Sequence, residues 1–272
     1  MKAKELLEAN QLSAAILELN QEVKQRPTDP RIRTFLFELL CFDGAYDRAE
    51  RQLDILGSQD DKAEIGIEVY RNLLKADAAR RRFFAGGAGP TFLTGPPEYM
   101  RECLTAVLLL HEGNPQSAKE LITKSKASAP RLSGTVNGRS FAGISDSDDR
   151  LWPALEVFSK GAYMWLPLEH IKTVSLRRPN FLRDLLWVPA HVECQDGQQG
   201  DVYLPTLYPG SESDESEQVR LGRITEWVNL GEGLVGGLGL KTFVIGDAET
   251  SLLEINELVI IGRISGPVLK SE

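Results

Sequence analysis

The sequence predicts an α+β protein in which an N-terminal α-α superhelix of tetratricopeptide-like hairpins precedes a compact, largely antiparallel and barrel-like β domain. Two observations lead to this prediction. A turn-and-alanine pattern recurs at the spacing of a helical hairpin within residues 1–129, and the apolar pattern becomes short and strand-like within residues 130–272. Because 272 residues exceed one average domain, we assign these two ranges to two domains.

The repeat occurs in residues 10–15, 44–49 and 113–118, which each begin with Asn or Gly and end with Ala. The first two copies are 34 residues apart, which is the period of a tetratricopeptide repeat, and the third follows after 69 residues, close to two periods. We interpret the first residue of each copy as a turn between antiparallel helices. The alanine then lets the two helices approach closely.

Helix boundaries are indicated by capping residues. Asp29 is a candidate N-cap and Pro30 suits the first helical position, ahead of one apolar stripe made by Ile32, Phe35, Leu36, Leu39 and Leu40. Farther along, residues 80–82 are three arginines that suit the C-terminal end of a helix before Gly86 and Gly87. We interpret this run as a solvated face rather than an anion site.

Two pairs of side chains in the repeat region are candidates for binding a partner. Arg33 and Phe37 share one face beside the buried stripe, and Tyr70 and Leu74 share a face in the next hairpin. Repeat arrays present grooves that receive a partner's amphipathic helix. An equally good interpretation is that Phe37 and Tyr70 only pack against the neighbouring hairpin.

The second half contains aromatic or β-branched stretches separated by turns. The expected strands cover residues 162–166, 171–176, 185–194, 201–208, 224–230, 240–245 and 252–261. Frequent prolines favour edges, bulges and a curved or barrel-like sheet. The acidic, serine-rich residues 211–217 are expected to form a mobile surface loop.

Composition excludes several classes of function. A net charge of −8 gives no electrostatic basis for binding nucleic acid, and no apolar run approaches the 18 residues of a membrane span. The first residues lead directly into amphipathic sequence without the apolar region of a secretory signal, which predicts a cytoplasmic protein. Cys41, Cys103 and Cys194 are widely spaced, so we expect free, buried thiols.

No segment satisfies the spacing of a catalytic, cofactor or metal motif. The glycine-rich residues 233–242 resemble a phosphate-binding loop, but Leu240 stands where glycine must precede the lysine. The best carboxylate group is Asp146, Asp148 and Asp149, since alternate acids in a loop can hold a divalent cation. The glycine and distal glutamate of a calcium loop are missing, so we favour a solvated or Arg150-paired structural loop.

A series of motifs in the second half carries a family resemblance. They lie in order at residues 137–141, 146–151, 161–167, 183–190, 204–208 and 220–227. With the repeat array ahead of them, they make the chain similar to the ImpE/SciE family, also called TagJ, of type VI secretion accessory proteins. The resemblance implies a cytoplasmic, non-enzymatic accessory factor that contacts the contractile sheath through the N-terminal helix of the small sheath subunit.

The motif residues are expected to be mainly structural. They are Asp146, Asp148, Arg150, Trp165, Arg183, Asp184, Trp187, Arg223 and Trp227. Arg183 and Asp184 could form an internal ion pair under Trp187 or could dock a partner, and we favour the ion pair. The alternative function is a metal- or small-molecule-binding enzyme domain recruited by the helical array, and its only support is the Asp146, Asp148 and Asp149 loop.

Overall fold

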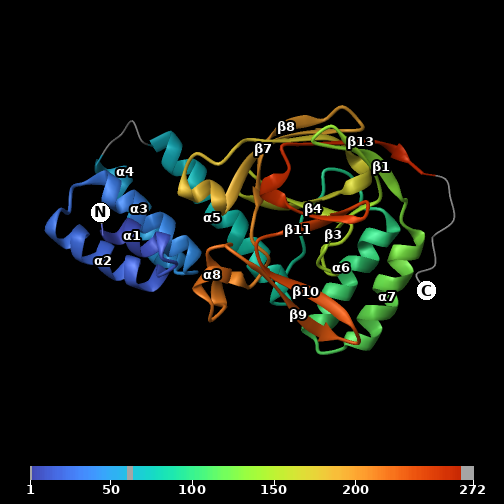
Figure 1. The fold of residues 1–272 in the computed structure, drawn as a ribbon, viewed down its shortest axis with the longest axis horizontal. Helices are drawn as coiled ribbons and strands as arrows, with labels where there is room; N and C mark the ends of the chain where they lie inside the picture. Colours follow the sequence, from blue (N-terminus) through green and yellow to red (C-terminus); the bar gives the residue numbers. More distant parts are fainter. Residues whose placement is uncertain (1, 60–63, 265–272) are drawn as a thin grey trace.

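The computed structural model describes residues 2–59 and 64–264. In this part helices come first and strands follow, so the fold is α+β as predicted (Figure 1). The helices are α1 (Lys2–Glu8), α2 (Leu12–Gln25), α3 (Pro30–Phe42), α4 (Tyr46–Gln59), α5 (Glu64–Phe84), α6 (Glu98–His111), α7 (Pro115–Ser128) and the short α8 (Glu217–Arg220). None of them is long and apolar enough to cross a membrane.

Three pairs of helices, α1–α2, α3–α4 and α6–α7, are joined by the same kind of turn. Asn10, Gly44 and Gly113 each adopt a left-handed backbone, with φ of 58°, 69° and 76°, a conformation that glycine and asparagine tolerate best. The alanines five residues later are fully buried. The recurring sequence pattern therefore reflects one recurring local geometry.

Helix α3 begins as its sequence predicts. The Asp29 carboxylate accepts a hydrogen bond from the Arg31 amide at 3.0 Å, and Pro30 occupies the first turn. Both features favour a helix start. The carboxylate binds one of the amides that have no partner within the helix, and proline has no amide hydrogen at all. The predicted apolar stripe is buried, apart from the partly buried Phe35.

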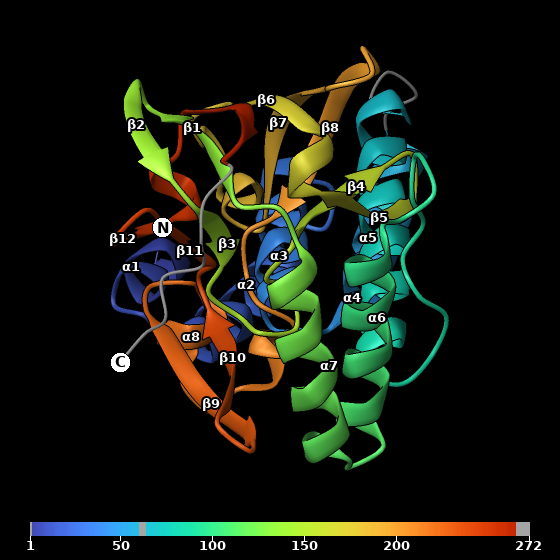
Figure 2. The ribbon, with the colours of Figure 1, turned by 90° about the vertical axis from the view of Figure 1, so that its right-hand side faces the viewer.

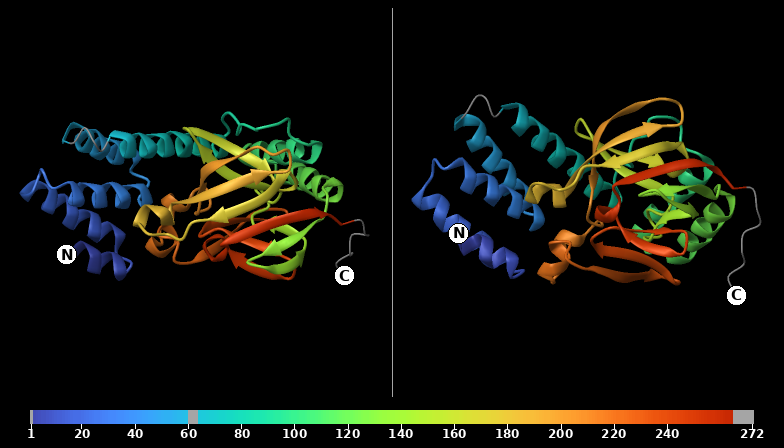
Figure 3. Two further views of the ribbon diagram at one scale, coloured as in Figure 1. Left: turned by 90° about the horizontal axis from the view of Figure 1, so that it is seen from above. Right: turned by 45° about the horizontal axis from the view of Figure 1, so that its top comes forward.

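The long helix α5 connects the first four helices to the strands. Figure 3 shows it extending from these helices along one side of the sheet. Beyond it, residues 85–97 form a connection that runs beside β5. There the Thr91 amide donates to the Tyr163 carbonyl, and the Thr91 carbonyl accepts from the Trp165 amide, both at 3.0 Å. Helix α7 lies beside the β9–β10 ribbon, and α6 packs against α7 (Figure 2).

The strands form three antiparallel sheets. The largest has eight strands in the order β2-β1-β13-β6-β7-β8-β4-β5, a second has the order β12-β11-β3, and the third is the β9–β10 ribbon. The strands are β1 (Leu132–Val136), β2 (Arg139–Ala142), β3 (Ile144–Asp146), β4 (Ala154–Ser159), β5 (Ala162–Pro167), β6 (Ile171–Leu176), β7 (Trp187–Cys194), β8 (Gln199–Pro205), β9 (Thr225–Gly231), β10 (Leu234–Gly239), β11 (Thr242–Ile245), β12 (Ala248–Ser251) and β13 (Glu257–Arg263).

The eight-stranded sheet is open, which corrects the expectation of a barrel-like sheet. Strands β2 and β5 are its edges, and no pairing among the described residues joins them. Strand β4 shows how the faces are covered instead. Phe158 packs in the cluster that includes Phe83 of α5, whereas Leu155 and Val157 pack in the cluster that includes Phe243 of β11. Helix α5 and the β12-β11-β3 sheet thus cover the apolar side chains that a closed barrel would have buried.

Residues 211–217, expected to be a mobile loop, are ordered against the helical hairpins. Ser211 is buried in the 3₁₀ turn η4 (Ser211–Ser213), and Ser216 caps α8 by accepting from the Val219 amide. Glu217 accepts a hydrogen bond from the Ser13 amide at 3.0 Å, and Arg220 pairs with Asp43 at 2.6 Å. Glu217 thus contacts α2 and the nearby Arg220 contacts the C-cap residue of α3, and the sequence pattern reveals neither contact.

Candidate partner-binding groove and buried ionic network

A groove of about 510 Å³ lies between α3, α4 and α5. Its apolar lining comes from three consecutive helices and consists of Pro30, Phe37, Leu53, Leu56, Ile67 and Tyr70. Thr28, Thr34, Gln59 and Gly66 add a polar or small rim. The guanidinium of Arg183, on the 3₁₀ turn η3 (Leu182–Leu185), reaches the groove from the strand region.

Two of the four predicted partner-binding residues meet in this groove. The rings of Phe37 and Tyr70 lie 5.5 Å apart, so each packs on the neighbouring hairpin and also lines the groove. Arg33 does not line it, because its side chain is buried and donates to the Pro27 carbonyl and to Gln52. Leu74 is buried in the core.

Three apolar residues of the groove, Leu53, Leu56 and Ile67, were not among the predicted partner-binding residues. A signal was present, because Leu53 and Leu56 are three residues apart on α4, and Ile67 precedes Tyr70 by three on α5. Such spacing places side chains on one face of a helix. What the spacing did not show is that these faces converge.

Arg183 forms its ion pair with Glu38 of α3 and not with its neighbour Asp184. Its guanidinium donates to Glu38 at 2.8 Å and lies 4.9 Å from the ring centre of Tyr70. The Asp184 carboxylate instead accepts from the amides of Asn180 and Phe181, at 2.9 and 3.0 Å, because it caps the start of η3. Burial raises the pKa of Glu38, against the opposing effect of Arg183. Trp187 is buried close by.

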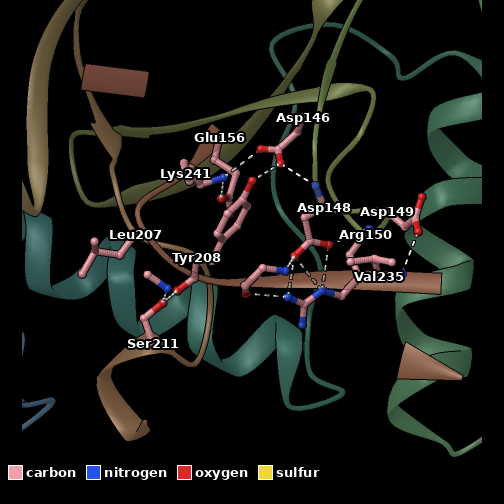
Figure 4. A network of polar contacts seen from close by, with 12 residues as sticks. Asp146, Asp148, Asp149, Arg150, Glu156, Leu207, Tyr208, Ser211, Val235 and Lys241 are labelled. Atoms are coloured by element: carbon pink, nitrogen blue, oxygen red, sulfur yellow. Dashed lines mark hydrogen bonds and ion pairs between the residues drawn. The ribbon is translucent and has the colours of Figure 1, made fainter. Parts of the chain in front are cut away.

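A second group of polar residues forms a buried ionic network between α5 and the sheets, and Figure 4 shows its part around Asp146, Glu156, Tyr208 and Lys241. Arg80 donates twice to Glu156 of β4, both at 2.7 Å, and once to the Leu207 carbonyl at 2.9 Å. Lys241 lies 2.5 Å from Glu156 and 3.3 Å from Asp146. Arg80 therefore does not belong to a solvated face, which corrects the interpretation of the arginine run.

Burial and charge pairing act in opposite directions on the pKa values of the two carboxyl groups next to Lys241. Burial raises the pKa of Glu156, but Arg80 and Lys241 outweigh it and bring the pKa down to about 2. For Asp146, burial outweighs Lys241 and raises the pKa to about 6. The Tyr208 hydroxyl donates to Asp146 at 2.9 Å. The sequence offered one signal for the network, since Glu156 interrupts an otherwise apolar strand.

Every carboxylate of the Asp146, Asp148 and Asp149 loop has protein partners. Asp148 binds the Arg150 guanidinium through both oxygens and accepts from the Gly237 amide at 2.9 Å. Asp149 accepts from the Val235 amide at 2.8 Å (Figure 4) and from Lys126 at 2.6 Å. Arg150 pairing is thus present, but Asp146 and Asp148 are buried rather than solvated. The described residues hold no cluster of His, Cys, Asp or Glu arranged for a metal ion.

Comparison with known proteins assigns the family. The model of the ImpE protein family matches residues 138–259, which include Asp146, Glu156 and Lys241 of the network but not Arg80. TagJ, the type VI secretion system accessory component of Pseudomonas aeruginosa, is 34% identical over 95% of this chain and 90% of its own. The chain belongs to the ImpE/TagJ family. The X-ray crystal structure of a Vibrio parahaemolyticus protein, 27% identical, matches with a TM-score of 0.89 over 97% of this chain and 99% of that one.

The remaining family-motif residues divide between the interior and the surface. The Trp165 indole is fully buried, packs edge-on against Phe83 at 5.5 Å and donates to the Tyr163 hydroxyl, which itself donates to Glu156. Trp227 is half-exposed and lies 5.9 Å from the ring of Tyr208. Arg223 is exposed. Most of these residues therefore position α5 and the β9–β10 ribbon.

Proposed function

We propose that this protein is a non-enzymatic, cytoplasmic accessory component of a bacterial type VI secretion system that binds the contractile sheath. In this proposal the N-terminal helix of the small sheath subunit occupies the groove between α3, α4 and α5. The observation that carries it is the apolar lining of that groove by three consecutive helices. Membership of the family that includes TagJ, an accessory component of type VI secretion, supports the setting.

The shape and lining of the groove suit an amphipathic helix. Such a helix buries side chains at i, i+3, i+4 and i+7 in an apolar groove and leaves its polar face in water. Helical repeat arrays provide such grooves, and we propose that residues 1–129 form a tetratricopeptide-like domain and residues 130–272 a β-rich domain. The left-handed turns at Asn10, Gly44 and Gly113 support the repeat assignment.

The ionic network is consistent with a groove that already has its shape before the partner binds. Tyr70 of α5 lines the groove, and ten residues later Arg80 of the same helix is held by Glu156. A helix rises about 1.5 Å per residue, so the anchor lies about 15 Å from the groove along one rigid element. Anchoring α5 reduces the entropy lost on binding, which favours affinity.

A pull-down with purified sheath subunit tests the proposal. The intact small subunit should be retained by this protein, whereas a form lacking its N-terminal helix should not. Retention that does not depend on the helix would contradict the groove model, and no retention of the intact subunit would contradict the sheath role.

A groove-blocking variant supplies the matched test on this chain. Gly66 lines the groove, and a Cβ atom there would meet no other atom within 4 Å. Gly66→Trp should therefore place an indole at the rim without a clash in the backbone and should abolish retention of the sheath subunit. Gly66→Ala is the control and should bind normally.

A further inference from the structure

A second hollow, of about 220 Å³, adjoins the groove and shares Tyr70 and Arg183 with it. Its other walls come from the segment between β6 and η3 and from strands β7 and β8. A helix lying in the groove would therefore meet this hollow at the end marked by Arg183.

The hollow has a concentration of positive charge. Arg177, Arg178 and Arg183 line it together with the carboxylate of Asp184, while Asp201 and Glu38, outside the lining, pair with Arg177 and Arg183. The Asp184 carboxylate is already engaged by the amides of Asn180 and Phe181. Three arginines around one hollow contrast with the net charge of −8 of the whole chain. A negatively charged group is the complementary ligand.

The three arginines differ in how strongly the protein already holds them. Arg183 is held firmly by its ion pair with Glu38. Breaking that pair would leave the mostly buried Glu38 carboxylate without a partner. Arg177 pairs with Asp201 at 3.3 Å, and both side chains are about two-thirds exposed, so this pair is weak. Arg178 is exposed and has no ion-pair partner among residues 2–59 and 64–264.

We propose that the helix bound in the groove carries an acidic residue beside its apolar face, and that Arg178, assisted by Arg177, pairs with its carboxylate. Arg183 positions the aromatic wall and does not change partner. This inference rests on the proposed function, since it assumes that a helix occupies the groove. The pair distinguishes the correct helix from other amphipathic helices, because apolar contacts alone discriminate poorly.

The test measures the affinity of a synthetic peptide that corresponds to the N-terminal helix of the small sheath subunit encoded in the same gene cluster. Arg178→Gln should weaken binding about two- to fivefold at low salt, as expected for a partly exposed ion pair. The difference should shrink when salt rises from about 50 mM to about 500 mM, since salt screens exposed charges. Arg139→Gln, which removes an exposed arginine on β2 at the far edge of the sheet, should have no effect.

Charge exchange identifies the acidic residue. Peptides in which one Asp or Glu at a time is replaced by Lys should bind the wild-type protein more weakly, and one of them should recover affinity toward Arg178→Glu. Equal affinities of wild type and Arg178→Gln at both salt concentrations would overturn this inference while leaving the proposed function intact, provided that Gly66→Trp still blocks the peptide. A peptide that does not bind, or that binds despite Gly66→Trp, would overturn both.

Discussion

Arg80 and Glu156 form a buried, two-pronged ion pair, with both nitrogen–oxygen distances at 2.7 Å, that joins helix α5 to strand β4. Neither side chain is more than 6% exposed. Lys241 and the Tyr163 hydroxyl satisfy the remaining capacity of the carboxylate. Buried charges are tolerated only when paired in this way, so the pair sets the position of α5 on the sheet.

Breaking this pair should destabilise the fold strongly. Arg80→Met is expected to lower the free energy of unfolding by about 3–5 kcal/mol, because Glu156 loses its main partner while remaining buried. Urea denaturation measures the change. The double variant Arg80→Met/Glu156→Leu should cost less than the sum of the single variants, and additive costs would contradict direct coupling. Arg82→Met, an exposed neighbour, should change stability by less than about 0.5 kcal/mol.

The titration of Asp146 should give the stability a particular pH dependence. Burial raises the native-state pKa of its carboxyl to about 6 from 3.8, so the native state binds this proton more tightly than the unfolded state. The stabilisation from that proton is present below pH 3.8 and is lost as pH rises through 6.

Asp146→Asn should remove this dependence. Between pH 4 and pH 7 the free energy of unfolding of Asp146→Asn should rise relative to that of the wild type by up to about 3 kcal/mol, the equivalent of the pKa shift. Urea denaturation of both proteins over that pH range gives the comparison. A difference that stays constant with pH would contradict the assignment of Asp146.

Gly237 should not tolerate a side chain. A Cβ atom there would lie 2.3 Å from the Tyr208 ring, and that ring is held by hydrogen bonds of its hydroxyl with Asp146 and the Thr242 carbonyl. Gly237→Ala is therefore expected to cost about 1–3 kcal/mol through overpacking, measured by denaturation. Gly262→Ala on β13 meets nothing within 4 Å and serves as the control. Equal effects of the two would show that Tyr208 can move aside.

Replacing Gly66 by alanine should stabilise the protein, in contrast to the same replacement at Gly237. Gly66 is an exposed glycine inside α5 with no neighbour near its missing Cβ. Gly66→Ala should raise the free energy of unfolding by up to about 1 kcal/mol, because alanine loses less backbone entropy in a helix. A thermal melt shows the gain, and a lower melting temperature would indicate that the site is not open as described.

Much of the fold could be predicted because it depends on local conformation. The predicted strands at residues 162–166, 171–176 and 185–194 correspond to β5, β6 and β7, since each contains several β-branched or aromatic residues. Strands β1–β4, β10 and β12 were not predicted. β3 has only three residues, and β10 contains three glycines, so neither carries a recognisable pattern. The run in β4 is apolar on both faces apart from Glu156, which hides its alternation.

By itself the sequence determined that most helices precede the strands, that the chain turns at Asn10, Gly44 and Gly113, and where α3 starts. The turns and the helix start depend on backbone conformations and caps within a few residues. Only the tertiary structure decided that Phe37 and Tyr70 line one groove, that Arg183 pairs with Glu38, and that Arg80 is buried. The partners of Arg80 and Arg183 lie 76 and 145 residues away. No short-range pattern encodes such pairings, since they arise when separate elements pack together.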